Sequence, residues 1–464
     1  MADSLDALFK PRSVALIGAS ASPAKLSHIA LKNLSKGRFK LYPVNPKEKE
    51  ILGLKCYPSV LAIQGVVDLA VISLPAAGSI APVRQCVEKG VEIVIVSSSG
   101  FGESGRNGEK LERELAEAVR GSRTRLLGPN TMGMYVPSNG LDTLFIPRER
   151  SARPGKGAIA VLSQSGAVSI SFLERAAEAG IGISACVGLG NKVDINENDL
   201  LMYLSTDKAT DCIALYLESF SDGRKFVDIV RKVSKIKPVV VLKSGRTKAG
   251  SAAARSHTGA LASSSDVMVD GVLRQVGAVR AYDEEELIDL AKALAYVNHV
   301  EGDRICVVAS AGGFGVIAAD YVESRDHGVG LTMARLSPET RNSIREMVPS
   351  YSSVNNPVDL TAAVTDEMYE AVLTRLQADP GVDGILMSLE LQPPNITKKL
   401  VDVAERRSRS KGARIVICAF GGPHTQDLLR EFEKRRVLAY PTLWRAARAL
   451  AALSERGYYL ERSK

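Results

Sequence analysis

Short runs of apolar, mostly β-branched residues alternate with helical patterns along the whole chain. In the first 130 residues, five such runs predict strands at residues 13–18, 39–44, 68–74, 91–97 and 124–128. Between them, residues 22–34 and 108–121 repeat apolar residues at the spacing of a helix. Strands that alternate with helices are typical of βαβ units and parallel sheets. The first block is therefore predicted to be one α/β domain.

The same alternation restarts twice further along the chain. The second block predicts strands at residues 158–163, 182–188, 212–218, 238–243 and 278–282, and a closing helix over 283–297 with an acidic start. The third block opens with a strand, a glycine-rich turn and a helix over 303–324, and continues with strands at 384–389 and 414–419 and a helix at 443–453. A polar segment with Pro and Gly between the first two blocks predicts a linker. The predicted fold is α/β, with three consecutive parallel-sheet domains at 1–130, 157–298 and 302–464 and a linker at 131–156.

The composition excludes several classes of protein. The 464 residues are 45% hydrophobic and 24% charged, as in an ordinary soluble globular protein. No apolar run reaches the roughly 18 residues that a membrane span needs, and the first residues lack the basic and apolar regions of a signal peptide. Six scattered cysteines without a CxxC pair indicate reduced thiols, neither disulfides nor a cysteine-bound metal. We therefore expect a cytoplasmic protein with no membrane contact and no metal site.

The net charge of +8 raises the question of a nucleic-acid partner. Aromatic residues make up only 5% of the chain, and its Lys and Arg residues are dispersed along it. A surface that stacks bases needs more aromatic faces than this. The charge favours small polyanions such as phosphates, carboxylates or a nucleotide-containing cofactor, and we expect no nucleic acid.

Three chemical features follow strands of the second block. The first is the turn Ser163, Gln164, Ser165 and Gly166, which opens a helix. Small residues at a helix start leave backbone N–H groups free to bind phosphate, although an ordinary N-cap in a tight turn is the alternative. The second is Glu218, for which a salt bridge to a neighbouring loop is the structural alternative. The third is His257, which lies among small residues in a predicted loop and could be a solvated histidine.

These features make chemical sense as one set, because the carboxyl ends of parallel strands meet at one edge of a sheet. A neutral imidazole can attack phosphorus and carry a phosphoryl group on one nitrogen. The other ring N–H needs an acceptor, which Glu218 can provide. The helix start at Ser165 would then hold the phosphoryl charge. Small residues around His257 would let the loop move between two positions, so the pattern predicts a mobile phosphohistidine.

The segments that carry these residues also resemble a known family. "SHTGALA", "LSQSGAVS", "GLGNKVDIN", "LYLESF" and "VVVLKSGRTKAG" together are similar to the α-subunit of the NDP-forming acyl-CoA synthetases. More narrowly they resemble the ADP-forming acetyl-CoA synthetases, relatives of succinyl-CoA synthetase, over essentially the whole chain. The resemblance implies that His257 is phosphorylated, that Glu218 orients or stabilises it, and that residues 163–166 contribute to the phosphate site.

The resemblance also implies a Rossmann-like coenzyme A domain followed by two flavodoxin-like domains. The turn after the first strand keeps only one glycine of a dinucleotide fingerprint, so it disfavours NAD, and a plain tight turn is the alternative. By position, the residues expected near coenzyme A are Gly18, Ser20, Lys25, Asn45, Lys47, Ser73 and Pro75. The third block contains the glycine-rich stretch 310–315 and the segment "NNPVDLT", to which we assign no catalytic residue.

The sequence contains neither a P-loop pattern nor a visible ATP-grasp module. In many relatives that module is a separate β-subunit, so the resemblance implies an ATP-grasp partner in an α2β2 assembly, with ADP or ATP and Mg²⁺ on the partner. The expected reaction is acyl-CoA + ADP + phosphate ⇌ carboxylate + CoA + ATP. The alternative is a coenzyme A- or nucleotide-sensing scaffold without turnover, whereas an NAD(P)-linked oxidoreductase is disfavoured by the missing glycines. The preferred acyl group depends on pocket volume, which the sequence leaves open.

Overall fold

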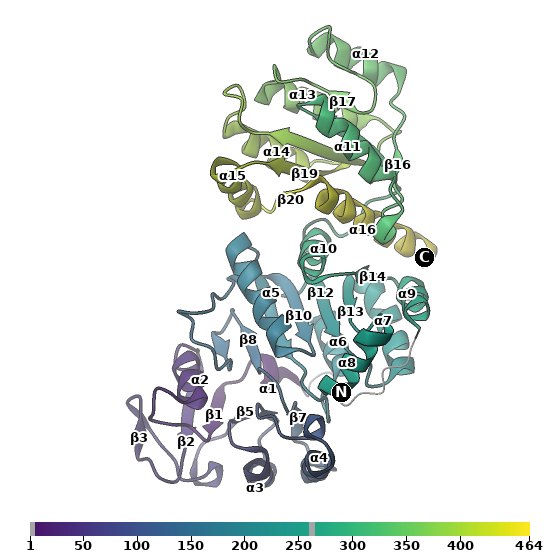
Figure 1. The fold of residues 1–464 in the computed structure, drawn as a ribbon. Coiled ribbons are helices and arrows are strands. Elements are labelled where there is room, and N and C mark those ends of the chain that lie inside the picture. Colours follow the sequence, from purple (N-terminus) through teal and green to yellow (C-terminus); the bar gives the residue numbers. More distant parts are fainter. Residues whose placement is uncertain (1–4, 259–264) are drawn as a thin grey trace. The chain divides into compact units, whose positions relative to one another are not determined.

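Two compact units make up the chain. The computed structural model describes residues 5–258 and 265–464, without the side chains of residues 255–258. The units are Met1–Glu284 and Glu285–Lys464, coloured from purple to teal and from green to yellow in Figure 1. The predicted α/β class with mostly parallel sheets is confirmed in both. Within the described residues, no helix is long and apolar enough to cross a bilayer.

The first sheet of unit 1 matches the five predicted strands. Its strands are β1 (Ser13–Ile17), β2 (Lys40–Val44), β5 (Leu69–Ile72), β6 (Ile93–Val96) and β7 (Arg125–Leu127). They run parallel in the order β2-β1-β5-β6-β7. The connecting helices are α2 (Leu26–Leu34), α3 (Ala76–Lys89) and α4 (Arg106–Val119), with α1 (Asp6–Phe9) before β1 and the small hairpin β3 (Glu50–Ile51) and β4 (Leu54–Lys55) after β2. Strands β1, β5 and β6 are wholly buried, which is why they appear as continuous apolar runs in the sequence.

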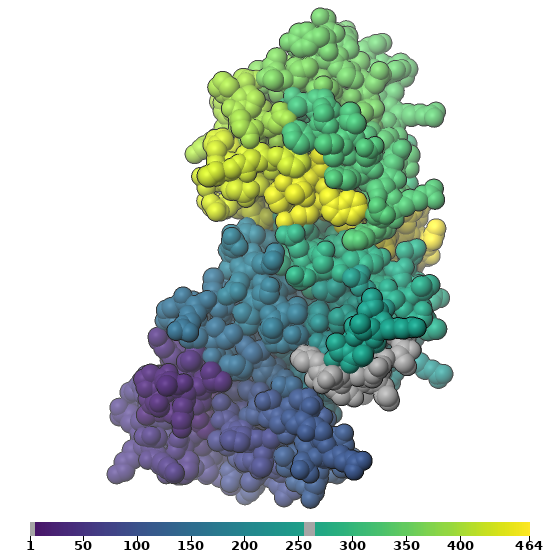
Figure 2. All heavy atoms as spheres, viewed as in Figure 1, coloured from purple at the N-terminus to yellow at the C-terminus, as the bar shows by residue number. Residues whose placement is uncertain are grey.

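The second sheet of unit 1 has a parallel body and an antiparallel edge. The body consists of β10 (Lys156–Ser163), β11 (Ile183–Gly188), β12 (Cys212–Leu217), β13 (Val239–Lys243) and β14 (Ala278–Ala281). Its helices are α5 (Gly166–Ala179), α6 (Glu197–Thr206), α7 (Gly223–Ile236), α8 (Lys248–Thr258) and α9 (Asp266–Gln275). The full order is β14-β13-β12-β10-β11-β8-β9. Buried residues of both sheets share one apolar core, and Figure 2 shows the blue atoms of the two domains as one continuous surface.

Part of the segment predicted as the linker 131–156 belongs to this sheet. It forms β8 (Met134–Val136), which pairs antiparallel with β11, and β9 (Leu141–Asp142). The segment is also anchored by the buried carboxylate of Asp142, whose Oδ2 lies 3.0 Å from Nε of Arg148 and 3.3 Å from Nε of Arg153. Strands of two or three residues have no periodicity to detect, so pairing with β11 decides this structure.

The segment predicted as the His257 loop forms helix α8 as far as Thr258. Its first turn is capped by Thr247, whose Oγ1 accepts from the N–H of Gly250 at 3.0 Å. The three consecutive alanines 252–254 are strong helix formers. The small residues that indicated a loop are therefore compatible with a helix, and the side chain of His257 lies outside the described residues.

Unit 2 repeats the parallel architecture. Its sheet has the order β16-β15-β18-β19-β20, and β17 pairs with β15. The strands are β15 (Arg304–Ala309), β16 (Thr332–Met333), β17 (Val358–Asp359), β18 (Gly384–Glu390), β19 (Arg414–Phe420) and β20 (Ala439–Tyr440). The helices are α10 (Glu284–Val297), α11 (Gly312–Glu323), α12 (Pro338–Met347), α13 (Asp366–Ala378), α14 (Lys399–Arg409), α15 (Pro423–Lys434) and α16 (Leu443–Arg462).

Helix α10 was expected to close the second domain, but nearly all of it lies in unit 2. Buried ion pairs hold it there. Asp289 lies 2.5 Å from Nε of Arg445 on α16, and Lys292 lies 3.3 Å from Glu433 on α15. These charge pairs join α10 to α15 and α16, and the local pattern of α10 does not encode them.

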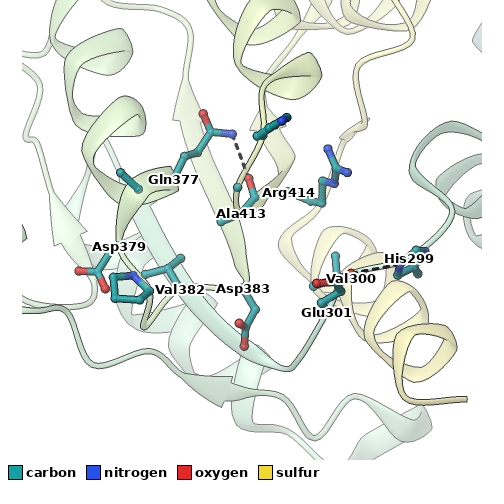
Figure 3. Close-up of a pocket in the computed structure, with 13 residues that line it drawn as sticks. His299, Val300, Glu301, Gln377, Asp379, Val382, Asp383, Ala413 and Arg414 are labelled. Carbon is teal, nitrogen blue, oxygen red and sulfur yellow. Dashed lines mark hydrogen bonds and ion pairs between the residues drawn. The ribbon is translucent and has the colours of Figure 1, made fainter. Parts of the chain in front are cut away.

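A pocket of about 610 Å³ opens at the amino ends of the unit 2 strands (Figure 3). Its wall includes His299, Glu301, Gln377, Asp379, Asp383 and Arg414. The Asp383 carboxylate is already paired with Arg304, at 2.9 and 2.7 Å. Because parallel sheets bind ligands beyond the carboxyl ends of their strands, the pocket lies at the opposite edge from a substrate crevice.

Candidate active site

Both sheets of unit 1 have a topological switch point where strand order reverses. In each, the first parallel strand lies between the second and the third parallel strands, so the crevice opens at the carboxyl ends of β1 and β5 and of β10 and β12. Ligands of open α/β sheets bind at such points. The predicted coenzyme A residues follow β1, β2 and β5, and the predicted phosphate residues follow β10 and β12. The topology therefore brings each predicted set to one crevice.

The turn after β10 presents the start of helix α5. Ser165 caps the helix, with its Oγ 3.5 Å from the N–H of Val168. Ser163 is buried, and its Oγ donates to the carbonyl of Ser165 at 2.8 Å, which fixes the turn. A side chain at Gly166 would displace Met132, because a Cβ there would lie 2.2 Å from Cγ of Met132. Ser165 is therefore the N-cap that was considered as the alternative to a phosphate site. The first backbone N–H groups of α5 nevertheless face the crevice, where they can stabilise an anion.

Gln164 joins this turn to the one that carries Glu218. Its Oε1 accepts from the backbone N–H of Glu218 at 2.9 Å and of Ser219 at 3.1 Å, and its Nε2 donates to Oγ of Ser219 at 3.0 Å. These three hydrogen bonds of the Gln164 side chain all join the turn after β10 to the turn after β12. The backbone N–H of Gln164 donates to the carbonyl of Tyr216 at 3.0 Å, so it is not available to a phosphate, and the side chain of Gln164 fixes the turn that carries Glu218.

Glu218 sits in a buried, positively charged setting. The residue is 5% exposed, and its Oε1 lies 3.3 Å from the hydroxyl of Tyr216. Its carbonyl accepts from Nζ of Lys243 at 2.7 Å. Burial lowers the pKa of Lys243, and the Glu218 carboxylate opposes that shift. A carboxylate held next to a buried cation at a strand end is suited to orient an imidazole and to stabilise its charged form.

A second buried cation, Lys192, was missed in the sequence. Its Nζ donates to the carbonyl of Ser219 at 2.7 Å and lies 3.2 Å from Oε2 of Glu197, with the two side chains 4% and 0% exposed. Glu197 in turn accepts from the N–H and hydroxyl of Ser221 at 2.6 and 3.0 Å. Burial lowers the pKa of Lys192, opposed by Glu197 and Glu218. The ion pair therefore clamps the turn that carries Glu218.

The backbone of Lys192 is left-handed, with φ of 61°, an uncommon conformation for a residue with a side chain. The residues before and after Lys192 are both hydrogen-bonded to turns of the first domain. Backbone bonds run from Asn191 to Pro129 at 2.9 Å and from Val193 to Gly128 at 3.1 Å. The Asn191 amide also donates to Glu103 at 2.7 Å. The motif "GLGNKVDIN" contains the lysine, but only these contacts reveal that it reaches the Glu218 turn.

Replacing Lys192 with methionine is expected to destabilise the protein by about 3–5 kcal/mol, because Glu197 would remain buried without its partner. Urea unfolding of the purified chain measures the loss. The matched control is Lys225→Met, which breaks a half-exposed pair with Asp199 at 3.9 Å and should cost less than about 1 kcal/mol. Equal losses of unfolding free energy in the two variants would show that the pair of Lys192 and Glu197 does not stabilise this turn.

His257 lies in the last turn of α8, which follows β13 at the same edge of the sheet. Helix α8 contacts the short turn Gly102–Ser104 after β6 of the first domain. The backbone of the predicted phosphohistidine thus belongs to a helix that borders both domains of unit 1. Its side chain lies outside the described residues, so its distance to Glu218 stays a prediction.

The predicted coenzyme A residues gather at the first switch point. Gly18 has φ of 88°, and a Cβ there would lie 2.5 Å from the carbonyl oxygen of Ser73, so only glycine fits. Ser20 is buried and its Oγ accepts from the N–H of Ser22 at 3.2 Å. Nδ2 of Asn45 donates to the carbonyl of Ala19 at 2.8 Å, which ties the turns after β1 and β2 together.

The remaining predicted residues of this site lie at its rim. Lys25, Lys47 and Pro75 are exposed. Lysines at the mouth of a crevice can attract phosphate groups without being fixed by the fold. Within the described residues, no group of three or more His, Cys, Asp and Glu is placed to hold a metal ion.

Comparisons with known proteins cover the whole length of the chain. Three family models match: the CoA binding domain at residues 12–137, the succinyl-CoA ligase like flavodoxin domain at 156–294 and the ligase-CoA domain at 305–456. The α subunit of acetate–CoA ligase [ADP-forming] I from Pyrococcus furiosus is 38% identical over 97% of both chains. Acetate–CoA ligase [ADP-forming] I from Archaeoglobus fulgidus is 37% identical over 98% of this chain and 64% of its own.

Solved structures show the same similarity in three dimensions. The dinucleotide-forming acetyl-coenzyme A synthetase 1 of Ca. Korarchaeum cryptofilum, in complex with phosphate and ADP, aligns with a TM-score of 0.90 and 34% identity. The alignment covers 100% of this chain and 99% of that one. Fold and sequence therefore agree along the entire chain.

Proposed function

Because the chain belongs to the family of ADP-forming acetate–CoA ligases, we propose that it carries the coenzyme A and phosphate sites of an acyl-CoA ligase. The proposed reaction is acyl-CoA + ADP + phosphate ⇌ carboxylate + CoA + ATP. The observation that supports it most is the second switch point. There the start of α5 and Glu218 lie on adjacent turns, tied together by the amide of Gln164.

The first step forms an acyl phosphate at the start of α5. A phosphate oxygen attacks the thioester carbon, the C–S bond breaks, and the proton of the phosphate passes to the departing thiolate. The backbone N–H groups at the start of α5, from Gly166 on, bind the phosphate, because those of Gln164 and Ser165 already donate to Tyr216 and Ser163. The helix dipole stabilises the phosphate charge. Coenzyme A is held by the first domain, at Gly18, Ser20, Lys25, Asn45, Lys47, Ser73 and Pro75.

The second and third steps move the phosphoryl group through His257. One ring nitrogen attacks phosphorus, the bond from phosphorus to the acyl oxygen breaks, and the carboxylate leaves. Glu218 accepts a hydrogen bond from the other ring N–H and stabilises the positive charge on the ring. A terminal oxygen of ADP then attacks phosphorus, and the N–P bond breaks to give ATP. The sensing scaffold has no use for this set of groups, so the catalytic function is favoured.

The nucleotide is proposed to bind to an ATP-grasp β-subunit, with Mg²⁺, in an α2β2 assembly in the cytoplasm. Two observations support a partner. Two relatives from Pyrococcus furiosus, which match 97% and 84% of this chain, are named as α subunits, and the three large sheets described here correspond to the coenzyme A, flavodoxin-like and ligase-CoA domains. The two-fold stoichiometry follows from the family resemblance.

Two measurements test this function. Calorimetry should show that the full chain binds coenzyme A but not NAD, since the first turn lacks the dinucleotide glycines. With acetyl-CoA, phosphate and MgADP, the chain alone should form no ATP, and addition of an ATP-grasp subunit from a relative should start the reaction. Binding of NAD in place of coenzyme A would overturn the assignment of the first domain. ATP formation by the chain alone would overturn the requirement for a partner.

A further inference from the structure

The turn of residues 128–133 lies between the two proposed sites. It follows β7 of the coenzyme A domain, and the N–H of Asn130 donates to the carbonyl of Ser98 after β6 at 2.8 Å. On its other side, Oγ1 of Thr131 donates to the carbonyl of Gly188 at the end of β11 at 2.6 Å. The N–H of Gly188 donates back to Gly133 at 2.8 Å. The turn is thus fixed against both sheets of unit 1.

Met132 projects from this fixed turn onto the start of α5. A Cβ built on Gly166 would lie 2.2 Å from Cγ of Met132 and 3.1 Å from its Sδ. The thioether therefore occupies the space directly beside the first residue of the proposed phosphate-binding helix. Its neighbours Thr131 and Gly133 are buried, whereas Met132 is only partly buried, so part of its surface remains available to a ligand.

The geometry of the first sheet leads the thioester past this side chain. From the switch point at β5 to the edge strand β7 there are two strand intervals, or about 10 Å at the usual spacing. A coenzyme A bound at the switch point must extend its thiol arm across β6 and β7 to reach α5. At phosphorolysis the carbonyl carbon bonds to a phosphate oxygen at α5, so the acyl chain lies within contact of residue 132.

We infer that Met132 forms an apolar wall of the acyl pocket and restricts this enzyme to short, unbranched acyl groups. This inference rests on the proposed function. The methionine side chain is apolar and polarizable, which suits contact with a small alkyl group. It also fills the volume that a longer or aromatic acyl chain would need. The hydrogen bonds of the turn 128–133 prevent the backbone of Met132 from moving away to make room.

The test compares wild type with Met132→Ala and with the isosteric control Met132→Leu. The assay follows the release of free coenzyme A from acetyl-CoA or butyryl-CoA in the presence of phosphate and the ATP-grasp subunit. The quantity compared is kcat/KM for each substrate. In Met132→Ala the butyryl-to-acetyl ratio should rise about tenfold, the scale of one or two methylene groups in an apolar pocket. In Met132→Leu the ratio should stay within about twofold, since the volume is conserved. An unchanged ratio in Met132→Ala would overturn the inference.

A larger side chain at residue 132 should make the acyl pocket smaller, and this test does not depend on whether the alanine variant folds. Met132→Phe should lower the butyryl-to-acetyl ratio, and a ratio equal to that of wild type would also overturn the inference. Failure of the proposed function gives a different result: wild type itself would then release no thiol from either acyl-CoA. A folded Met132→Ala protein that is inactive with both substrates would assign Met132 a structural role only.

Discussion

Replacing His257 with alanine should abolish ATP formation by the enzyme assembled with its partner, lowering the rate by roughly 10⁴-fold or more. The reason is chemical: removing the nucleophile leaves the acyl phosphate without an acceptor for its phosphoryl group. Release of the thiol from acyl-CoA in phosphate should persist in part, because that step precedes the histidine. Rapid-quench assays of ATP and of thiol release separate the two steps.

The phosphorylated intermediate can be observed directly. Labelled phosphate supplied with acetyl-CoA should appear on the wild-type chain in an acid-labile, base-stable form, as expected for a phosphoramidate. His424 on α15 is exposed, and His424→Ala serves as the matched control that keeps both labelling and turnover. Acid-labile labelling and wild-type ATP formation in His257→Ala would disprove the phosphohistidine and leave His257 as an ordinary surface histidine.

Replacing Glu218 with glutamine should slow phosphoryl transfer to and from His257 by about 10²-fold, with little effect on coenzyme A binding. Glutamine keeps the volume but not the charge, so the imidazole loses the group that orients it and stabilises its charged form. Single-turnover measurements of phosphohistidine formation and decay report this step. The buried Lys192 and Lys243 next to Glu218 would lose a countercharge, so the melting temperature of the variant is measured in parallel.

Glu109→Gln provides the matched control for charge. Glu109 is exposed on α4, which follows β6 and not a strand of the second switch point, and its replacement should leave phosphoryl transfer unchanged. If Glu218→Gln transfers phosphate at the rate of Glu109→Gln, Glu218 plays no part in the reaction. A variant that only melts earlier would show that the carboxylate stabilises the turn and does not act on the histidine.

Much of the fold could be predicted from local pattern. Strands such as β5 and β6 are buried on both faces, so they appear as unbroken apolar runs with polar turns between them. The positions of Ser165 and Glu218 directly after strands followed from the same pattern. Parallel topology then required those positions to meet at one edge, and the structure has them at the second switch point.

Elements without a strong local signal were decided by tertiary contacts. Strand β8 has three residues and exists through its pairing with β11. Helix α3 was not predicted, because Gly78 and Pro82 interrupt its pattern. Helix α10 has a clear helical pattern, but the pattern does not reveal the pairing of Asp289 with Arg445 that joins the helix to α16.

The sequence by itself determined the α/β class, the order of its blocks and the residue types at the strand ends, because backbone periodicity and turn chemistry are local. Only the tertiary structure decided which side chains act together. Gln164 reaches the backbone of Glu218, Lys192 pairs with Glu197 beneath the same turn, and Met132 covers Gly166. Such contacts depend on strand order and on where loops such as that of Lys192 are held, and neither leaves a periodic trace along the chain.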